Sequence, residues 1–218
     1  MSSVVISIGT ATLLAISTVA HADTIYISSY VSHTITQFTS DGVGSVFATM
    51  SSGPSGLALD GQGNLYVAMT LDNTIMKFTP NGVGSVFANT GLSWPAGLAF
   101  DGTGNLYAAN FANNTVTKIT PNGVSSSYVS TGLSEPYALT FDSAGNLYVG
   151  NDGVYNGDVN GTITKVTPAG NGSVFAAGFS DPQGLAFDAQ GNLYVANTLY
   201  SVNSIMKIAP NGSSALFA

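Results

Sequence analysis

The sequence predicts an all-β protein, a β-propeller of about five four-stranded antiparallel blades, and three observations predict it. The string Gly-Asn-Leu-Tyr occurs at residues 63–66, 104–107, 145–148 and 191–194, with a degenerate copy at 23–26. The copies lie about 40 to 46 residues apart, which is the period of a propeller blade. No segment shows sustained helical periodicity, and each repeat holds four short apolar runs separated by turn residues.

The strands can be followed in order through the second repeat. Residues 56–60, 65–69, 74–79 and 84–89 are rich in Val, Ile, Phe, Tyr and Thr, as strands are. Asp-Gly-x-Gly-Asn separates the first two runs and Pro-Asn-Gly the last two, and both supply residues that tight hairpins require. An Asp precedes the first turn in four repeats, and we interpret it as a cap of that turn. These residues are Asp60, Asp101, Asp142 and Asp188.

The strand count differs between the first repeat and the others. Strands two to four occur five times, but the innermost strand occurs four times, beginning near residues 56, 97, 138 and 184. We therefore expect an incomplete first blade. Three alternatives remain open: residues 13–17 supply the missing strand, the sequence is part of a longer six-bladed ring, or a second chain closes the ring through the open blade edge.

The N-terminus predicts export. Residues 4–20 are apolar and small, and they run into Ala20-His21-Ala22, an A-x-A pattern typical of a signal peptidase site. No basic residue precedes the run. We interpret residues 1–22 as a signal peptide, with 23–218 as the propeller, in a protein that is secreted, periplasmic or on the cell surface. Ser, Thr and Gly interrupt the run, so we expect no stable membrane span in the mature chain.

Composition excludes several functions. Eleven acidic residues stand against four lysines and no arginine, for a net charge of −7, so nucleic acid is not an expected partner. There is no cysteine for a disulfide, a thiolate metal site or a nucleophile. After removal of the signal peptide only His33 remains as a histidine, and no Ser, His and Asp spacing resembles a nucleophile elbow. The sequence therefore offers no convincing catalytic constellation.

The repeat resembles a known family. Pro-x-Gly-Leu-Ala-Phe-Asp, Gly-Asn-Leu-Tyr-Val-Ala-Asn and Ile-x-Lys-Phe-x-Pro-x-Gly together look like the NHL repeat over essentially all of 23–218. This resemblance implies a propeller related to gluconolactonase-like, regucalcin-like and virginiamycin B lyase-like proteins, a group that includes extracellular sensors, scaffolds and lyases. It does not choose among those functions.

Residues that depart from the repeat gather in loops expected on one face of the ring. Trp94, Glu135 and Asp181 share the position before a proline, and carboxylates with an indole there could bind a cation or a sugar-like ligand. Aromatic anchors such as Tyr137 and Tyr200 are expected beside them. The remaining candidates of this face are the asparagines that follow the repeated tyrosine strand: Asn110, Asn151 and Asn197.

The loop at residues 151–161 is longer than its counterparts. Its Asn-x-Asp-x-Asn-Gly segment matches the start of a calcium loop, where alternating oxygens converge on the ion, but the final Glu is missing. A weak site for Ca²⁺ or another divalent cation would then borrow a further ligand. A flexible connection is the alternative. The residues of the expected metal site are Asp152, Asn156, Asp158 and Asn160.

These observations favour an exported, acidic propeller that binds a ligand through its loop face, with a protein, peptide or glycan as the partner. One alternative is a metal-dependent hydrolase or lyase of the lactonase kind, in which Glu135 and the three asparagines would hold the metal. The other alternative is a structural protein of the cell envelope.

Overall fold

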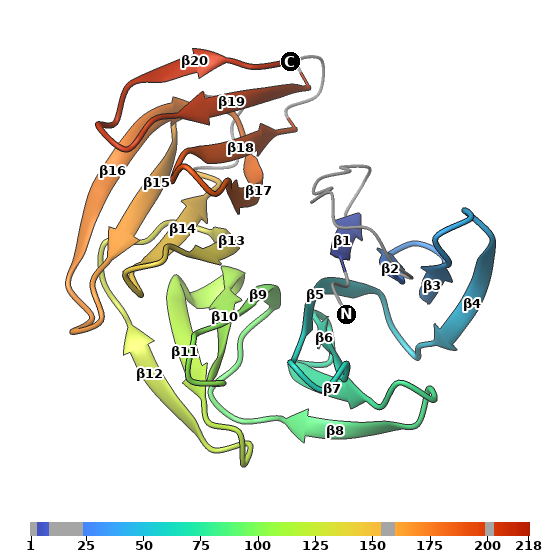
Figure 1. The fold of residues 1–218 in the computed structure, drawn as a ribbon. Helices are drawn as coiled ribbons and strands as arrows, with labels where there is room; N and C mark the ends of the chain where they lie inside the picture. Colours follow the sequence, from blue (N-terminus) through green and yellow to red (C-terminus); the bar gives the residue numbers. More distant parts are fainter. Residues whose placement is uncertain (1–3, 9–23, 154–159, 199–202) are drawn as a thin grey trace.

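The protein is described by a computed structural model over residues 4–8, 24–153, 160–198 and 203–218. These residues form five four-stranded sheets, arranged as successive blades (Figure 1). The fold is a β-propeller. The fold class predicted from the repeats is confirmed, and the one helical segment in the described residues is a 3₁₀ turn, Phe111–Asn113.

Each blade follows chain order from the centre of the ring outward. Blade 1 holds β1 (Val4–Ile8), β2 (Ile25–Ser29), β3 (Thr34–Phe38) and β4 (Gly44–Thr49). Blade 2 holds β5 (Pro54–Leu59), β6 (Leu65–Met69), β7 (Thr74–Phe78) and β8 (Gly84–Ala88). Blade 3 holds β9 (Pro95–Phe100), β10 (Leu106–Asn110), β11 (Thr115–Ile119) and β12 (Ser125–Val129). Blade 4 holds β13 (Pro136–Phe141), β14 (Leu147–Asn151), β15 (Gly161–Val166) and β16 (Gly172–Phe179). Blade 5 holds β17 (Pro182–Phe187), β18 (Leu193–Asn197), β19 (Ser204–Ile208) and β20 (Ser214–Leu216).

Blade 1 differs from the others at its innermost position. There β1 pairs with β2 in parallel, with Val4 opposite Ile25, whereas every other strand pair is antiparallel. The first blade therefore has a strand at the position that the sequence left empty, and that strand is residues 4–8. Residues 13–17, the segment considered for this role, lie outside the described residues. The signal peptide over residues 1–22 stays a prediction.

Apolar side chains are buried between neighbouring blades. One side of each blade, which we call its tyrosine face, carries the repeated tyrosine, and the other side, its leucine face, carries the repeated leucine. The tyrosine face of one blade packs on the leucine face of the next, as Tyr66 of blade 2 does on Leu98 and Leu106 of blade 3. Four such clusters join blades 1 to 5 in sequence, and the leucine that begins the second strand is fully buried in each.

The innermost strands approach one another closely. A Cβ on Gly97 of β9 would lie 2.2 Å from the carbonyl oxygen of Tyr137 on β13, so only glycine fits there. This close approach brings the ends of the inner strands together around a narrow axis. Residues at the start of each inner strand therefore share one small region.

The edge of the ring that carries the Asp-Gly turns, which we call the turn face, repeats one arrangement. Asp101 Oδ1 accepts hydrogen bonds from the backbone N–H groups of Thr103 and Asn105, at 2.9 Å each. Its Oδ2 accepts from Asn105 Nδ2 and from the Tyr107 hydroxyl. The same bonds from the turn recur at Asp60, Asp142 and Asp188, so the predicted turn-capping role is confirmed.

All four lysines of the chain lie on this turn face. Each Nζ sits 5.1 to 5.6 Å from the centre of the repeated tyrosine ring of its own blade, a cation–π distance. Lys77 and Lys165 also lie 3.8 Å from the capping aspartates. The opposite edge, the loop face, therefore contains no lysine, and the chain has no arginine.

Candidate functional site

The loop face holds the residues that break the repeat, at three positions in each blade. The first position precedes the inner-strand proline, the second follows that proline, and the third follows the last residue of the second strand. The first position is Gly53, Trp94, Glu135 or Asp181; the second is Ser55, Ala96, Tyr137 or Gln183; the third is Tyr30, Thr70, Phe111, Asp152 or Thr198. These positions differ in chemistry while their neighbours repeat.

The residues before proline are held by neighbouring blades. The backbone N–H of Trp94 donates to Asn73 Oδ1 at 2.7 Å, and that of Glu135 donates to Asn114 Oδ1 at 2.6 Å. Both asparagines belong to the hairpin of the preceding blade. The loops between strands two and three and the links between blades therefore lie together on one face, as the sequence predicted.

Three of these residues have a backbone conformation that glycine adopts more easily. The φ angles of Trp94, Glu135 and Asp181 are +49°, +50° and +52°. A side chain in this left-handed region costs about 1 kcal/mol, so the position favours glycine on stability alone. Three different large or charged side chains are nevertheless present there.

Gly53, the fourth member of this position, has a separate reason to be glycine. Its φ is not in the left-handed region, but a Cβ there would meet the Tyr30 ring at 2.5 Å. The Tyr30 ring therefore lies directly over Gly53. Tyr30 enters the loop face in place of a side chain at residue 53.

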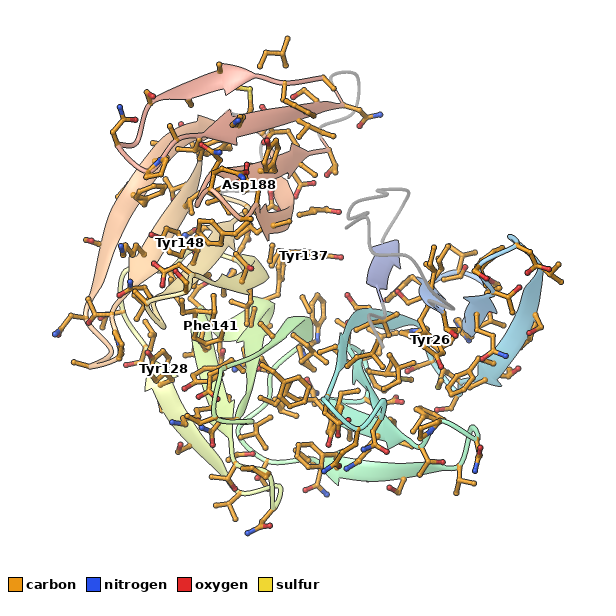
Figure 2. All side chains as sticks on the ribbon, viewed as in Figure 1. Tyr26, Tyr128, Tyr137, Phe141, Tyr148 and Asp188 are labelled. Carbon is orange, nitrogen blue, oxygen red and sulfur yellow. The ribbon has the colours of Figure 1, made fainter. Side chains whose placement is uncertain are left out.

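A β-bulge places Tyr137 in the site. On β13, Pro136 pairs with Asn151 and Ala138 pairs with the adjacent Gly150, so Tyr137 is an extra residue with no partner on β14. Bulges re-aim a side chain away from the regular pleat. Figure 2 shows Tyr137 on the inner side of blade 4, toward the centre of the ring.

The Tyr137 hydroxyl lies among residues of four blades. Burial raises the pKa of Tyr137, a hydrogen bond with Ser55 opposes that rise, and the charges of Asp181 and Asp152 add to it. The ring also packs edge-on against Phe111, with centroids 6.4 Å apart. Tyr137 thus brings together an aromatic surface and an acidic one.

Asp152 and Asp181 lie beside Tyr137, and Glu135 lies near enough for its charge to act on Asp152. Burial raises the pKa of Asp152 to about 7, and the charge of Asp181, a hydrogen bond with Asp181 and the charge of Glu135 contribute further. The backbone N–H of Asp152 donates to the Glu135 carbonyl oxygen at 3.1 Å. Near pH 7 the Asp152 carboxyl therefore holds a proton in part, and a protonated Asp152 can donate to Asp181.

Asp181 is fixed by blade 5, and two acceptor atoms of the group remain unfilled. Its Oδ2 accepts from Thr198 Oγ1 at 2.9 Å and from Gln183 Nε2 at 2.8 Å. Among the described residues, Asp181 Oδ1 and Glu135 Oε2 are buried atoms with no hydrogen-bond donor. We call Glu135, Asp152, Asp181 and Tyr137 the acidic mouth.

The three predicted asparagines occupy the ends of their strands, where they tie blades to links. Asn110 and Asn151 are 0% and 1% exposed. Asn110 Oδ1 accepts from the backbone N–H of Ser93, its Nδ2 donates to Thr115 and Thr117, and Asn151 repeats this arrangement in blade 4. Asn197 is 7% exposed and donates to Ser204. The amides of Asn110 and Asn151 are therefore occupied by bonds within the fold, and their ligand-binding role stays a prediction.

Trp94 lies at the link into blade 3, and most of the expected calcium loop lies outside the described residues. Trp94 is 48% exposed at the link into blade 3, and its carbonyl oxygen accepts from the backbone N–H of Phe111. Asn156, Asp158 and Tyr200 lie outside the described residues, and Asn160 is exposed. Asp152, expected to assist the calcium loop, lies instead in contact with Asp181.

The part of the chain that the structure describes contains no group of three His, Asp or Glu side chains placed to hold a metal ion. It also contains no helix with the length and apolarity to cross a bilayer.

Sequence reasoning did not single out as site residues five members of the loops on this face: Tyr30, Phe111, Ser55, Gln183 and Thr198. A signal was present, since aligning the repeats shows that the second and third positions vary as much as the position before proline. The bulge after each inner-strand proline, which turns the second position toward the axis, leaves no trace in local propensity.

Solved structures with this fold are found at low sequence identity. Virginiamycin B lyase from Staphylococcus aureus matches with a TM-score of 0.70 and 17% identity, over 92% of this chain and 68% of that one. A chain of the nidogen/laminin complex matches with a TM-score of 0.74 and 19% identity, over 88% and 76%. A putative gluconolactonase matches with a TM-score of 0.68 and 18% identity, over 84% and 69%.

This chain has the fold of these propellers. No family model and no curated protein matches its sequence. The propeller fold implied by the NHL resemblance is confirmed by these neighbours, which range from a protein complex to a lyase and a gluconolactonase. Function must therefore be argued from the loop face itself.

Proposed function

We propose that this protein is an exported binding module whose loop face recognises a positively charged group, such as a lysine or arginine side chain of a partner protein or peptide. The observation that carries the proposal is the convergence of Glu135, Asp152 and Asp181 with no lysine or arginine near them. A bound cation would neutralise this group, and the two unfilled oxygens would accept its N–H donors.

The aromatic residues support an organic cation. Tyr137 and Phe111 present ring surface beside the carboxylates, and rings of this kind attract ammonium and guanidinium groups. Trp94 and Tyr30 are further aromatic residues of the loop face. A lactonase-like or lyase-like activity is the second candidate, favoured by the unpartnered Glu135 carboxylate oxygen on the loop face in a fold shared with such enzymes.

Binding of butylammonium, with uncharged n-butanol as the matched probe, tests the proposal. We expect butylammonium to bind, n-butanol not to bind, and binding near pH 7 to release a proton because the cation lowers the pKa of Asp152. Calorimetry in two buffers of different ionisation enthalpy measures that release.

Charge-matched variants make the test specific. Asp181→Asn should weaken butylammonium binding at least tenfold, whereas Asp41→Asn, which removes one exposed charge from a hairpin turn, should leave it unchanged. Equal losses in both variants, or no discrimination between butylammonium and n-butanol, would rule out the acidic mouth as the binding site.

Export is tested separately. Expressed with its N-terminus in a bacterial host, the protein should be recovered outside the cytoplasm with Asp23 as its first residue, which mass spectrometry of the intact chain measures. Such processing removes β1 (Val4–Ile8), so the exported chain keeps β2, β3 and β4 as its first blade. Recovery of an unprocessed cytoplasmic chain would contradict the proposal of export but leave the binding proposal intact.

A further inference from the structure

Each contact between blades joins two unlike surfaces. In blades 2, 3 and 4 the repeated tyrosine packs edge-on against two rings, one from the outer strand of its own blade and one from the inner strand of the next blade. Tyr148, for example, lies 5.1 Å from Phe175 and 4.9 Å from Phe187, measured between ring centroids. A tyrosine face is thus complete only when a leucine face covers it.

The tyrosine face of blade 5 is uncovered. Tyr194 has a ring contact with Phe217 at 5.0 Å, but the described residues provide no ring from a following blade. The tyrosines of blades 1 to 4 are 4 to 6% exposed, whereas Tyr194 is only partly buried. Beside it, Leu216 and Phe217 are 70% and 60% exposed.

The leucine face of blade 1 is the face that a preceding blade would cover with its tyrosine, and among the described residues no blade covers it. Ile25 and Ile27 of β2 are partly exposed, whereas the residues at the same positions of blades 2 to 5 are fully buried. Phe38 is partly exposed, while its counterpart Ile119 is fully buried. No apolar cluster joins blade 5 to blade 1 in the described part of the chain, and Figure 1 shows β17 and β1 at the two ends of an arc.

We propose that these two end faces form a docking surface for one further blade, a partner segment with the chemistry of a single repeat. Such a blade would place Leu and Phe of its inner strand on Tyr194 and its own tyrosine on Ile25 and Ile27, continuing the four contacts already present. In the fold neighbours, roughly a quarter to a third of each chain lies outside the match.

The occupant is one blade and not a second copy of this chain. A second copy would bring five blades. One of them could enter between blade 5 and blade 1, but the other four would then collide with the first copy. A single sheet has both faces that are needed. Its leucine face would cover the tyrosine face of blade 5, and its tyrosine face would cover the leucine face of blade 1. This inference does not depend on the acidic mouth.

A blade attached to the chain tests the surface. Residues 89–129, the link and strands of blade 3, are added directly after Ala218, which occupies the same repeat position as Ala88. We expect the Tm to rise by at least about 5 °C and amide exchange in residues 25–29 to slow at least tenfold. The matched control carries Leu98→Asp and Phe100→Asp in the added copy and should show neither effect.

A second variant keeps the test decisive if the added blade does not fold. In the unmodified chain, Tyr194→Ser should lower the Tm far less than Tyr148→Ser, because Tyr194 lacks a covering blade. Equal losses would show that the face is already covered and would overturn the proposal. It would also be overturned if the unmodified chain were a dimer by light scattering and Tyr194→Glu made it monomeric, since the occupant would then be a second copy.

Discussion

The turn face and the loop face are built from the same repeat but differ in how far their polar groups are satisfied. On the turn face, each capping aspartate accepts from two backbone N–H groups and an asparagine amide. On the loop face, Glu135 Oε2 and Asp181 Oδ1 are buried with no donor, and the pKa of Asp152 is raised by burial and by its acidic neighbours.

This difference separates scaffold from site. A residue present in the same role in each blade is explained by the geometry that every blade needs, whereas a residue present in one blade is not. Glu135 is the only glutamate and Trp94 the only tryptophan of the chain, and both lie on the loop face. The comparison predicts that turn-face substitutions reduce stability and that loop-face substitutions change binding instead.

The largest effect is expected from removing a repeated ring. Tyr107 is 4% exposed and packs against Tyr128 and Phe141 at 4.9 and 5.0 Å, so Tyr107→Ala should cost about 3 to 5 kcal/mol of unfolding free energy. Trp94→Ala, which removes a larger but 48% exposed ring from the loop face, should cost less than about 0.5 kcal/mol. Urea denaturation measures the unfolding free energy of both variants. Similar losses of unfolding free energy would contradict the difference between the two faces.

A smaller effect is expected from exchanging carboxylates on the two faces. Asp101→Ala leaves the N–H groups of Thr103 and Asn105 without their acceptor and should cost about 2 kcal/mol. Glu135→Gln removes a carboxylate oxygen that has no donor and should change stability by less than about 0.5 kcal/mol. Thermal denaturation measures the stability of both variants. A large loss of stability in Glu135→Gln would show that this side chain has a structural role.

Acid should weaken the turn face selectively. Partial burial favours protonation of Asp101, but hydrogen bonds from Asn105 and Thr103 outweigh it and hold its pKa at about 2, below 3.8 in the unfolded chain. Its contribution to stability is therefore complete above about pH 4 and is lost as the pH falls toward 2. The Tm gap between the parent and Asp101→Asn should close over that range, and a constant gap would contradict this assignment.

The smallest effect has the opposite sign and belongs to the loop face. Because the pKa of Asp152 is about 7 in the folded protein against 3.8 unfolded, ionisation of Asp152 destabilises the fold as the pH rises from about 4 to 7. Allowing for solvent screening, Asp152→Asn should raise stability at about pH 8 by about 1 kcal/mol, or roughly 3 °C in Tm. At about pH 4 the variant and the parent should melt together.

Much of the fold could be predicted because the repeat states each structural requirement several times. The positions of Gly104, Asp101 and Tyr107 recur in the other blades, so turn, cap and core residue were recognisable without coordinates. The inner strand of blade 1 was not predicted, since Val4–Ile8 carries no repeat motif and pairs in parallel with β2. β1 is recognised only through its pairing with β2, so its own residues do not predict its place in blade 1.

The residues of the candidate site were recognisable from the sequence in part, and their roles stay predictions. Glu135, Asp181 and Tyr137 were named from their place beside the inner-strand prolines, and the structure brings them together. Asp152 was expected to serve the long loop, yet it joins Asp181. Asn110 accepts from the backbone N–H of Ser93 in a link between blades, and its ligand-binding role stays a prediction.

The sequence by itself determined the blade, because the spacing of turn residues and the alternation of apolar side chains are local properties that fix each four-stranded sheet. Only the tertiary structure decided which carboxylates meet, since Asp152 of blade 4 and Asp181 of the next link lie 29 residues apart and approach through the stacking of sheets about a common axis. It also decided that, among the described residues, no blade covers one face of blade 1 and one face of blade 5, because the burial of a face depends on the neighbour that packs against it and not on its own residues.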